Sequence, residues 1–320
     1  MLPEQPNAEL LLAPGDIGIT RYRRTLSVRL NNAKRPNPMH ERNVIMKKLQ
    51  VVLGGTSGMG LATAKALGVF GPVLVGGRNQ RRLDNALAEL KDTGVDAYGK
   101  TVDIADIDSL EDFAKYAASI APIGTLINAA GVDSGGPDLI LAVNFKGTVN
   151  VINAFMPYLQ DAKVINYSSI TGYFHQPTPA EIEIWQDPDA PDFVERMKAE
   201  LSSRPLDPRM AFLGDDYIYY PASKAFTIYY TKANTVRLGK KNTAIFSVAP
   251  GSFDTPMLRE SPEEQLAKIA QGTAFGRLGD PAEMADFIVK LLEPGHEYLT
   301  GVDLILDGGK SAMTLVKQLD

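Results

Sequence analysis

Short apolar runs alternate with amphipathic segments along most of this chain. Strand and helix signals in strict alternation predict an α/β fold, with a doubly wound parallel sheet covered by helices on both faces. The clearest helical pattern covers Gln80–Thr93 and ends before Gly94, a residue suited to a helix C-cap. The predicted strands are Gln50–Leu53, Pro72–Val75, Ala97–Val102, Thr125–Ile127, Val164–Tyr167, Ala244–Ala249 and Val302–Leu306.

Residues 1–45 depart from this alternation. They are polar and rich in arginine, and they lack the apolar core of a signal peptide. Several acidic residues among them argue against a transit peptide. Met46, followed by two lysines, stands just before the first strand and looks like a native start. We therefore expect residues 1–45 to be a disordered extension and residues 46–320 to form a single domain.

A glycine-rich turn joins the first predicted strand to an amphipathic segment. Strand, glycine turn and helix in this order are the context of a dinucleotide-binding site. Glycines let the backbone approach a pyrophosphate, and the helix N-terminus offers free N–H groups. The spacing of Gly54, Gly58 and Gly60 differs from the G-x-G-x-x-G of ordinary Rossmann dehydrogenases. The residues expected to contact the cofactor are Gly54, Thr56, Ser57, Gly58, Met59 and Gly60.

Tyr220 and Lys224 form a second candidate site. They stand four residues apart, so on a helix the phenol and the ammonium share one face. Of the twelve tyrosines, only Tyr220 has lysine four residues later. A free phenol titrates near pH ~10, and a neighbouring positive charge favours the phenolate. The pair predicts a proton donor and acceptor for an alcohol–carbonyl couple.

These motifs, together with others further along the chain, resemble those of the classical short-chain dehydrogenase/reductase family. The glycine turn resembles T-G-x-x-x-G-x-G, with Leu53 where threonine is usual, and the ordered set covers residues 48–310. The resemblance implies a Rossmann-type fold and a nicotinamide-dependent oxidoreductase. The other matching segments are Asn128-Ala129-Ala130-Gly131 (Ala129 for the second Asn of N-N-A-G), Asn144 with Gly147, Ser168 to Gly172, Pro250-Gly251 with Thr255, Gly276 to Pro281, and Asp307-Gly308-Gly309.

The resemblance implies catalytic roles for four residues. Tyr220 would protonate the carbonyl oxygen, and Lys224 would lower the pKa of Tyr220 and bind the nicotinamide ribose. Ser169 would hydrogen-bond the substrate oxygen; Ser168 is the adjacent alternative, but Ser169 has the right spacing to Gly172. Asn144 would hold a water that relays protons to Lys224. The resemblance adds further cofactor contacts, namely Asp103, Asn128, Ala129, Ala130, Gly131, Tyr220, Lys224, Pro250, Gly251 and Thr255.

The end of the second predicted strand bears on the choice of cofactor. No acid is present there to accept the ribose 2′-OH, because Gly77 occupies the position where the family usually has aspartate. Arg78 follows, and a guanidinium suits a 2′-phosphate. We therefore expect NADP(H), with NAD(H) as the weaker alternative. A role for Arg78 limited to capping or to stacking on the adenine stays open.

A different nucleotide motif is also present. Gly94 to Thr101 match the P-loop pattern G-x-x-x-x-G-K-[ST]. A working P-loop follows a buried strand and opens a helix at its Lys-Thr pair. Here a helical pattern precedes the motif, and its own alternation predicts a strand. The context therefore argues against nucleotide hydrolysis.

Composition narrows the possible functions. The chain has 320 residues, of which 44% are hydrophobic, and a net charge of −5, so it can bury a sizeable core and has no general nucleic-acid footprint. It has no cysteine, and its three histidines form no H-x-x-x-H pair. We expect no metal site, which argues against a zinc-dependent alcohol dehydrogenase. No apolar run approaches the ~20 residues of a membrane span, so we expect a cytoplasmic protein without membrane contact.

Residues 174–216 interrupt the alternation between Ser169 and Tyr220. They mix apolar residues with acids and prolines and are too long for a bare loop, so we expect one or two helices. This insertion resembles the layout of the bacterial 3α-hydroxysteroid dehydrogenase/carbonyl reductase branch, which typically prefers NAD. Two hypotheses stay open: a lid over the substrate cleft, or a surface decoration that alters oligomerisation.

The function expected from the sequence is the interconversion of a carbonyl and a secondary alcohol with NADP(H). An NAD-dependent hydroxysteroid-type dehydrogenase and a non-catalytic NADPH sensor of the same fold are the alternatives. The apolar insertion favours a bulky hydrophobic substrate, and a small carbonyl compound stays open. A homodimer or homotetramer is expected.

Overall fold

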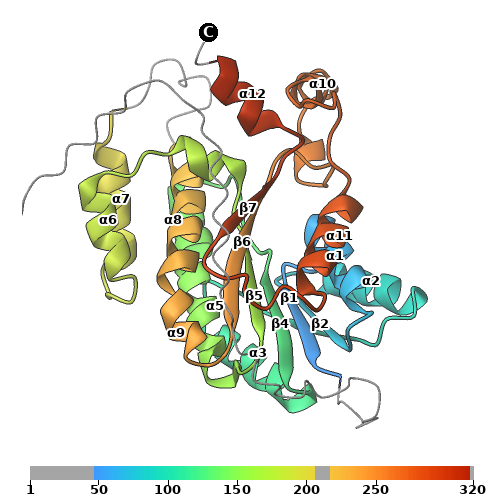
Figure 1. Ribbon diagram of the computed structural model, residues 1–320. Coiled ribbons are helices and arrows are strands. Elements are labelled where there is room, and N and C mark those ends of the chain that lie inside the picture. Colours follow the sequence, from blue (N-terminus) through green and yellow to red (C-terminus); the bar gives the residue numbers. More distant parts are fainter. Residues whose placement is uncertain (1–46, 206–216, 318–320) are drawn as a thin grey trace, which may run out of the picture. The chain divides into compact units, whose positions relative to one another are not determined.

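The computed structural model describes residues 47–205 and 217–317. The predicted extension over residues 1–45 and the last part of the predicted insertion lie outside the described residues. Seven parallel strands form one sheet in the order β3-β2-β1-β4-β5-β6-β7 (Figure 1). They are β1 (Leu49–Leu53), β2 (Val73–Gly77), β3 (Ala97–Thr101), β4 (Ile123–Asn128), β5 (Lys163–Tyr167), β6 (Ala244–Pro250) and β7 (Asp303–Leu306).

The strand order is that of a doubly wound Rossmann-type sheet, and all seven predicted strands are confirmed to within two residues at each end. The chain builds outward from β1 to β3 and then returns to place β4 on the other side of β1. At this reversal Leu53 of β1 pairs with Asn128 of β4. A crevice opens outside the carboxyl ends of the strands at such a point, and ligands of α/β sheets bind there.

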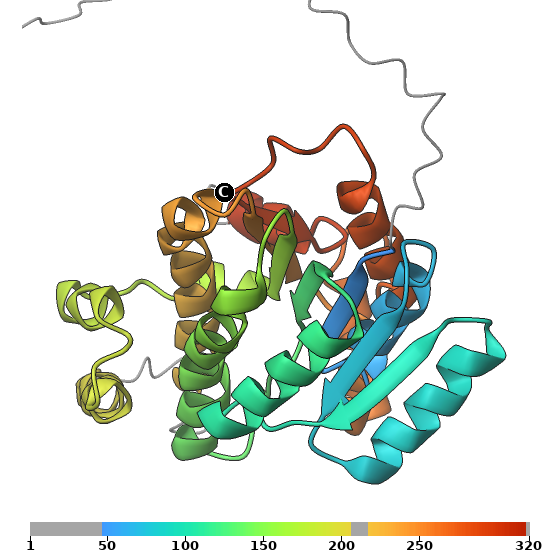
Figure 2. The same ribbon diagram turned by 90° about the horizontal axis from the view of Figure 1, so that it is seen from below.

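Helices cover both faces of the sheet (Figures 1 and 2). One face packs against α1 (Gly58–Leu67), α2 (Gln80–Asp92) and α11 (Pro281–Leu292), and the other against α3 (Ile107–Ile120), α5 (Gly147–Phe155) and α8 (Tyr219–Ala233). Each face therefore has its own hydrophobic core. In β1, Val51 belongs to the core beneath α3, α5 and α8, and its neighbour Val52 belongs to the core beneath α1, α2 and α11, because successive side chains of a strand point to opposite faces.

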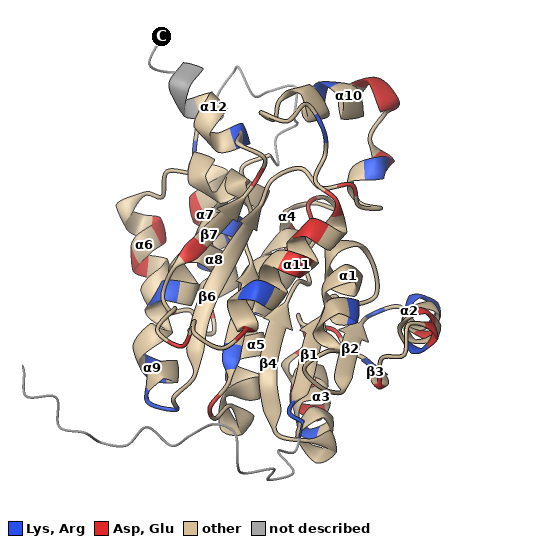
Figure 3. Cartoon of the chain, turned by 45° about the vertical axis from the view of Figure 1, so that its right-hand side comes forward, with Lys and Arg blue, Asp and Glu red and all other residues tan. Residues whose placement is uncertain are grey.

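The remaining helical elements lie at the ends and edges of these layers. Charged side chains of both signs are interspersed over the outer helices, whereas the sheet is nearly free of them (Figure 3). These elements are α4 (Pro137–Ile140), α6 (Pro179–Gln186), α7 (Phe193–Ser203), α9 (Thr235–Gly239), α10 (Glu263–Gln271), α12 (Lys310–Lys317), a π-helical segment (Leu141–Lys146) and 3-10 turns at Met156–Tyr158, Ile170–Phe174 and Leu258–Glu260.

The segment that matches the P-loop pattern, Gly94 to Thr101, contains the predicted strand. Helix α2 ends as expected, with Gly94 in the left-handed region at φ +81° and its N–H bonded to the carbonyl oxygen of Lys91. Residues 97–101 then pair with β2 as strand β3. Lys100 and Thr101 therefore belong to a strand and do not open a helix, so this segment lacks the geometry of a P-loop.

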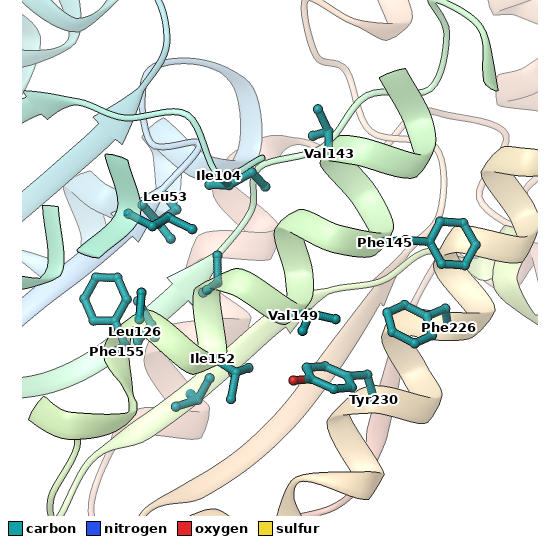
Figure 4. Packing of buried hydrophobic residues seen from close by; sticks show 14 of the residues in the cluster. Leu53, Ile104, Leu126, Val143, Phe145, Val149, Ile152, Phe155, Phe226 and Tyr230 are labelled. Atoms are coloured by element: carbon teal, nitrogen blue, oxygen red, sulfur yellow. The ribbon is translucent and has the colours of Figure 1, made fainter. Parts of the chain in front are cut away.

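One helical stretch contradicts the expectation that no apolar run approaches the length of a membrane span. Pro137–Tyr158 comprises 22 residues and contains an 18-residue window with a mean hydropathy of 1.4, enough to cross a membrane by length and composition. In the fold, 78% of this window is buried. Its side chains, among them Val149, Ile152 and Phe155, pack in the core (Figure 4), which accounts for its apolar composition.

The insertion contains the two helices expected of it, α6 and α7. They pack on α8 and on the π-helical segment through aromatic side chains. The ring centroids of Trp185 and Phe226 lie 5.8 Å apart, and those of Phe193 and Phe226 lie 5.5 Å apart. Phe226 also stacks on Phe145 at 5.1 Å, as Figure 4 shows. The described part of the insertion is thus an extension of the main core.

A buried carboxylate, that of Glu181, links the two ends of this pair of helices. Glu181 is fully buried; one carboxylate oxygen lies 2.5 Å from His175 Nε2 and the other lies 2.6 Å from Arg204 Nη1. His175 precedes α6 and Arg204 follows α7. The carboxylate therefore ties the two ends of the helical pair together, and its charge is compensated as burial requires.

We expect Phe193→Ala to lower the free energy of unfolding of the whole protein by about 3–5 kcal/mol. Phe193 is 1% exposed and contributes to the same core as the sheet. The matched control is Phe275→Ala, since that ring is 74% exposed. Urea unfolding followed by circular dichroism and tryptophan fluorescence provides the measurement. A large loss of Trp185 signal before the sheet unfolds would show instead that the insertion is an independent unit.

Candidate active site

The glycine turn brings two backbone segments into direct contact at the start of α1. Gly54 and Gly58 have φ values of +76° and +53°, a region that favours glycine. A side chain at Gly60 would collide with the carbonyl oxygen of Gly54. At Gly54, an added Cβ would lie 2.6 Å from the backbone nitrogen of Ala130. The turn therefore closes tightly between the first turn of α1 and the end of β4.

A cavity of about 640 Å³ opens beside this turn, at the carboxyl ends of β1, β2 and β4. We call it the glycine-lined cavity. Its volume falls within the usual range of cofactor sites. Twelve of the residues predicted to contact the cofactor line it, namely Gly54, Thr56, Ser57, Gly58, Met59, Gly60, Arg78, Asp103, Ala129, Ala130, Gly131 and Thr255.

The other five predicted cofactor contacts lie elsewhere. Four of them line a neighbouring cavity: Pro250, Gly251, Tyr220 and Lys224. Asn128 lines neither cavity, so its predicted contact is not supported. It is the last residue of β4, lies between β1 and β5, and is only 3% exposed. The loop that follows, Ala129 to Gly131, supplies the wall of the cavity in its place.

Arg82 was missed from the sequence and also lines the glycine-lined cavity. It lies in the first turn of α2, and its backbone N–H donates to the Asn79 side chain that caps this helix. Arg78 and Arg82 are both exposed at the end of β2. The signal that could have identified this second guanidinium was its place in the first turn of the predicted helix that follows Arg78.

A second cavity, of about 260 Å³, adjoins the first. We call it the catalytic cavity because Ser169, Tyr220 and Lys224 line it together. Seven residues line both cavities: Met59, Ala129, Gly131, Val132, Tyr167, Thr255 and Met257. Side chains from two distant parts of the chain, the segment after β5 and helix α8, thus meet directly beside the glycine-lined cavity.

The structure distinguishes the two adjacent serines. Ser168 Oγ lies 2.8 Å from the carbonyl oxygen of Val248 and 2.7 Å from a carboxylate oxygen of Asp303, so its hydroxyl is engaged within the sheet. The hydroxyl of Ser169 caps the following 3-10 turn and is hydrogen-bonded to Tyr220. Ser169 is therefore the serine placed beside the phenol.

Asn144 lies in the π-helical segment, a local distortion that is frequent at functional sites. Its side chain accepts from the Val132 backbone N–H at 3.0 Å and donates to the Val132 carbonyl oxygen at 2.7 Å and to Ser223 Oγ at 3.0 Å. Ser223, which the sequence did not single out, stands between Tyr220 and Lys224. Asn144 thus fastens the loop after β4 to the helix that bears the catalytic pair; its water relay stays a prediction.

Two family models match this chain. One, described as short chain dehydrogenase, matches residues 48–180; the other, described as enoyl-(acyl carrier protein) reductase, matches residues 210–311. The chain belongs to the classical short-chain dehydrogenase/reductase family. The more specific resemblance to the 3α-hydroxysteroid dehydrogenase branch stays a resemblance.

Curated relatives and solved structures cover most of the chain. A short-chain dehydrogenase/reductase of Alternaria brassicicola is 28% identical over 83% of this chain and 97% of its own length. A 3-oxoacyl-[acyl-carrier-protein] reductase of Thermotoga maritima is 25% identical over 82% of this chain and 97% of its own. The crystal structure of an actinorhodin polyketide ketoreductase matches with a TM-score of 0.65 and 25% identity, covering 82% of this chain and 97% of that one.

The insertion of this short-chain dehydrogenase/reductase does not form the expected lid in its described part. None of residues 174–205 lines the glycine-lined cavity or the catalytic cavity. Helices α6 and α7 lie instead on the outer side of α8 (Figure 2), where their aromatic side chains are buried. The described helices therefore do not cover either cavity, and the hypothesis of a surface decoration that alters oligomerisation stays a prediction.

Burial dominates the electrostatics of the catalytic pair. It raises the pKa of Tyr220 to about 12, although the hydrogen bond to Ser169 opposes this and the charge of Asp133 adds to it. Burial also lowers the pKa of Lys224 to about 8, against the attraction of Asp133. The expectation that Lys224 lowers the pKa of Tyr220 is thus wrong for the net shift. Loss of hydration disfavours both charged forms.

We expect Lys224→Met to raise the free energy of unfolding at pH 7 by about 1–3 kcal/mol while activity is lost. Below its folded pKa of about 8, Lys224 is charged in the folded and the unfolded states, and folding must desolvate that charge. The advantage of the variant should shrink as pH rises from 8 towards the unfolded pKa near ~10.4.

Urea unfolding at several pH values measures this effect. Lys232→Met is the matched control, because Lys232 lies on the same helix and is exposed. A Lys224→Met protein less stable than the wild type at pH 7 would show that the hydrogen bond from Lys224 Nζ to the Tyr167 carbonyl oxygen, at 3.0 Å, outweighs desolvation.

Proposed function

We propose that this short-chain dehydrogenase/reductase interconverts a carbonyl and a secondary alcohol with NADP(H). The observation that carries the proposal is the convergence of Ser169, Tyr220 and Lys224 on one cavity beside the glycine-lined cavity. The residues fit a dinucleotide: the turn at Gly54 and Gly60 leaves no room for side chains, and the cavity beside it begins at a helix N-terminus.

NADP(H), when bound, would supply or accept the hydride, and the protein supplies the proton. The Tyr220 hydroxyl is the proton donor to the carbonyl oxygen during reduction. A free phenol is already protonated at neutral pH, and burial raises the pKa of Tyr220 further, to about 12. Ser169 orients the same oxygen by a hydrogen bond. The ammonium of Lys224, 5.6 Å from the centre of the Tyr220 ring, stabilises the phenolate that remains.

Two arginines support the choice of NADP(H). Arg78 and Arg82 both line the glycine-lined cavity, and Gly77 stands where an acid would repel a 2′-phosphate. Guanidinium groups bind phosphate through charge-assisted hydrogen bonds. The related polyketide ketoreductase was solved with NADPH.

A non-catalytic sensor of the same fold is the rival function. A sensor would need only the glycine-lined cavity, in which the dinucleotide would bind. The catalytic cavity, with a serine and a tyrosine hydrogen-bonded to each other beside a buried lysine, supports the enzyme.

We expect Tyr220→Phe to lower kcat for NADPH-dependent ketone reduction by about 100- to 10,000-fold, because the substrate oxygen loses its proton donor. Affinity for NADPH, followed by fluorescence titration, should change little. Tyr229→Phe, on the same helix but packed against Trp185, is the matched control and should keep its activity. Tight NADPH binding without turnover of any ketone in the wild type would favour the sensor.

We expect Arg78→Asp to lower kcat/KM for NADPH by about 10- to 100-fold, since a charged hydrogen bond is lost and a repulsive charge is added. The value for NADH should rise, because aspartate can accept from the ribose hydroxyl. Arg81→Asp is the control: this neighbour is exposed and outside the cavity. An unchanged ratio of NADPH to NADH would limit Arg78 to capping or stacking.

A further inference from the structure

Lys310 introduces a positive charge into the wall of the catalytic cavity. It is the first residue of α12, which Figure 1 shows above the carboxyl ends of the strands. Its Nζ lies 3.1 Å from Ser252 Oγ, and both residues line the cavity. Lys310 is partly buried, and this burial lowers the pKa of its ammonium group, against the attraction of Asp307.

The nearest acid in the sequence is already engaged. One carboxylate oxygen of Asp307 accepts from the Gly309 N–H at 2.9 Å, and the other accepts from the Ser311 N–H at 2.7 Å. Over residues 47–205 and 217–317, no carboxylate forms an ion pair with Lys310 within 4.0 Å. A partly desolvated ammonium beside a neutral hydroxyl is unfavourable until an anion joins it.

The cofactor's phosphates do not account for this ammonium. Lys310 and Ser252 line the catalytic cavity but not the glycine-lined cavity beside the helix N-terminus. Asp133, the acid that also lines the catalytic cavity, acts on Tyr220 and Lys224, whereas Lys310 responds to Asp307. Among the described residues, the ammonium of Lys310 thus faces the catalytic cavity without a carboxylate paired to it within 4.0 Å.

We infer that the substrate carries an anionic group, a carboxylate or a phosphate, which Lys310 binds together with Ser252 while Tyr220 and Ser169 hold the reacting oxygen. This inference rests on the proposed function, since it assigns the substrate class of the same cavity. At about 260 Å³, the cavity lies below the usual range of ligand sites. A small oxo acid or oxo phosphate therefore fits it better than the bulky apolar ketone expected from the insertion.

The kinetic test compares acetoacetate with its neutral methyl ester at saturating NADPH. We expect Lys310→Met to reduce the preference for the acid over the ester, measured as the ratio of the two kcat/KM values, by about 10- to 100-fold. Reduction of the ester should be unchanged, and Lys310→Arg should keep most of the preference. Lys290→Met, at an exposed lysine of α11, is the control.

A binding test needs no turnover and therefore separates this inference from the proposed function. Butyrate, propyl phosphate and neutral butyramide are titrated into the protein–NADP⁺ complex and into the protein alone by calorimetry. Binding of either anion that is lost in Lys310→Met and kept in Lys290→Met supports the inference, and the tighter anion identifies the group. No anion binding by the wild type, or equal binding by Lys310→Met, overturns it. Failure to reduce any ketone, with the anion result intact, counts against the proposed function alone.

Discussion

The position of helix α8 against the sheet decides where every catalytic group lies. Its backbone touches the 3-10 turn after β5 at Gly172, where an added Cβ would lie 2.8 Å from the backbone carbon of Lys224. This close approach brings Ser169 to Tyr220. On its other side, Ser223 receives a hydrogen bond from Asn144 in the π-helical segment. A single helix thus presents the phenol and the ammonium while two other elements bring the serine and the asparagine to it.

The burial of Tyr220 and Lys224 holds them in place and also disfavours their charged forms. The packing that positions Tyr220 and Lys224 also removes water from them, so both charged forms become less favourable than in solution. A neutral phenol is suited to donating a proton, which is the task that reduction requires of it. The buried lysine, in contrast, lowers stability for the sake of function, a common trade-off at active sites.

The helices of the insertion pack against the outer side of α8. Trp185 and Phe193 pack on Phe226, which lies two residues beyond Lys224 in the sequence and is fully buried. The aromatic residues that suggested a hydrophobic substrate are therefore occupied by packing within the protein. What remains in the catalytic cavity is a small space with the ammonium of Lys310 in its wall. Our inference of an anionic substrate therefore rests on that wall and not on the apolar composition of the insertion.

The sequence by itself determined the order of strands and helices, the glycine turn, and the identity of Tyr220, Lys224 and Ser169 as candidates. These features depend on local periodicity and on spacing within one element, which a single chain displays directly. Even the segment from Gly94 to Thr101, which matches the P-loop pattern, contains the predicted strand, because the alternation of side chains is a local signal.

Only the tertiary structure decided which candidates meet. Asn128 is buried in the sheet, Arg82 joins Arg78, and Ser168 turns to Asp303, on a strand far along the chain. The pKa of Tyr220 rose where a neighbouring lysine had suggested a fall, since burial depends on everything packed around the site. The pairing of Lys310 with Ser252 was likewise beyond the sequence, because it joins the first residue of α12 to the loop after β6, and the pairing of β6 with β7 creates their proximity.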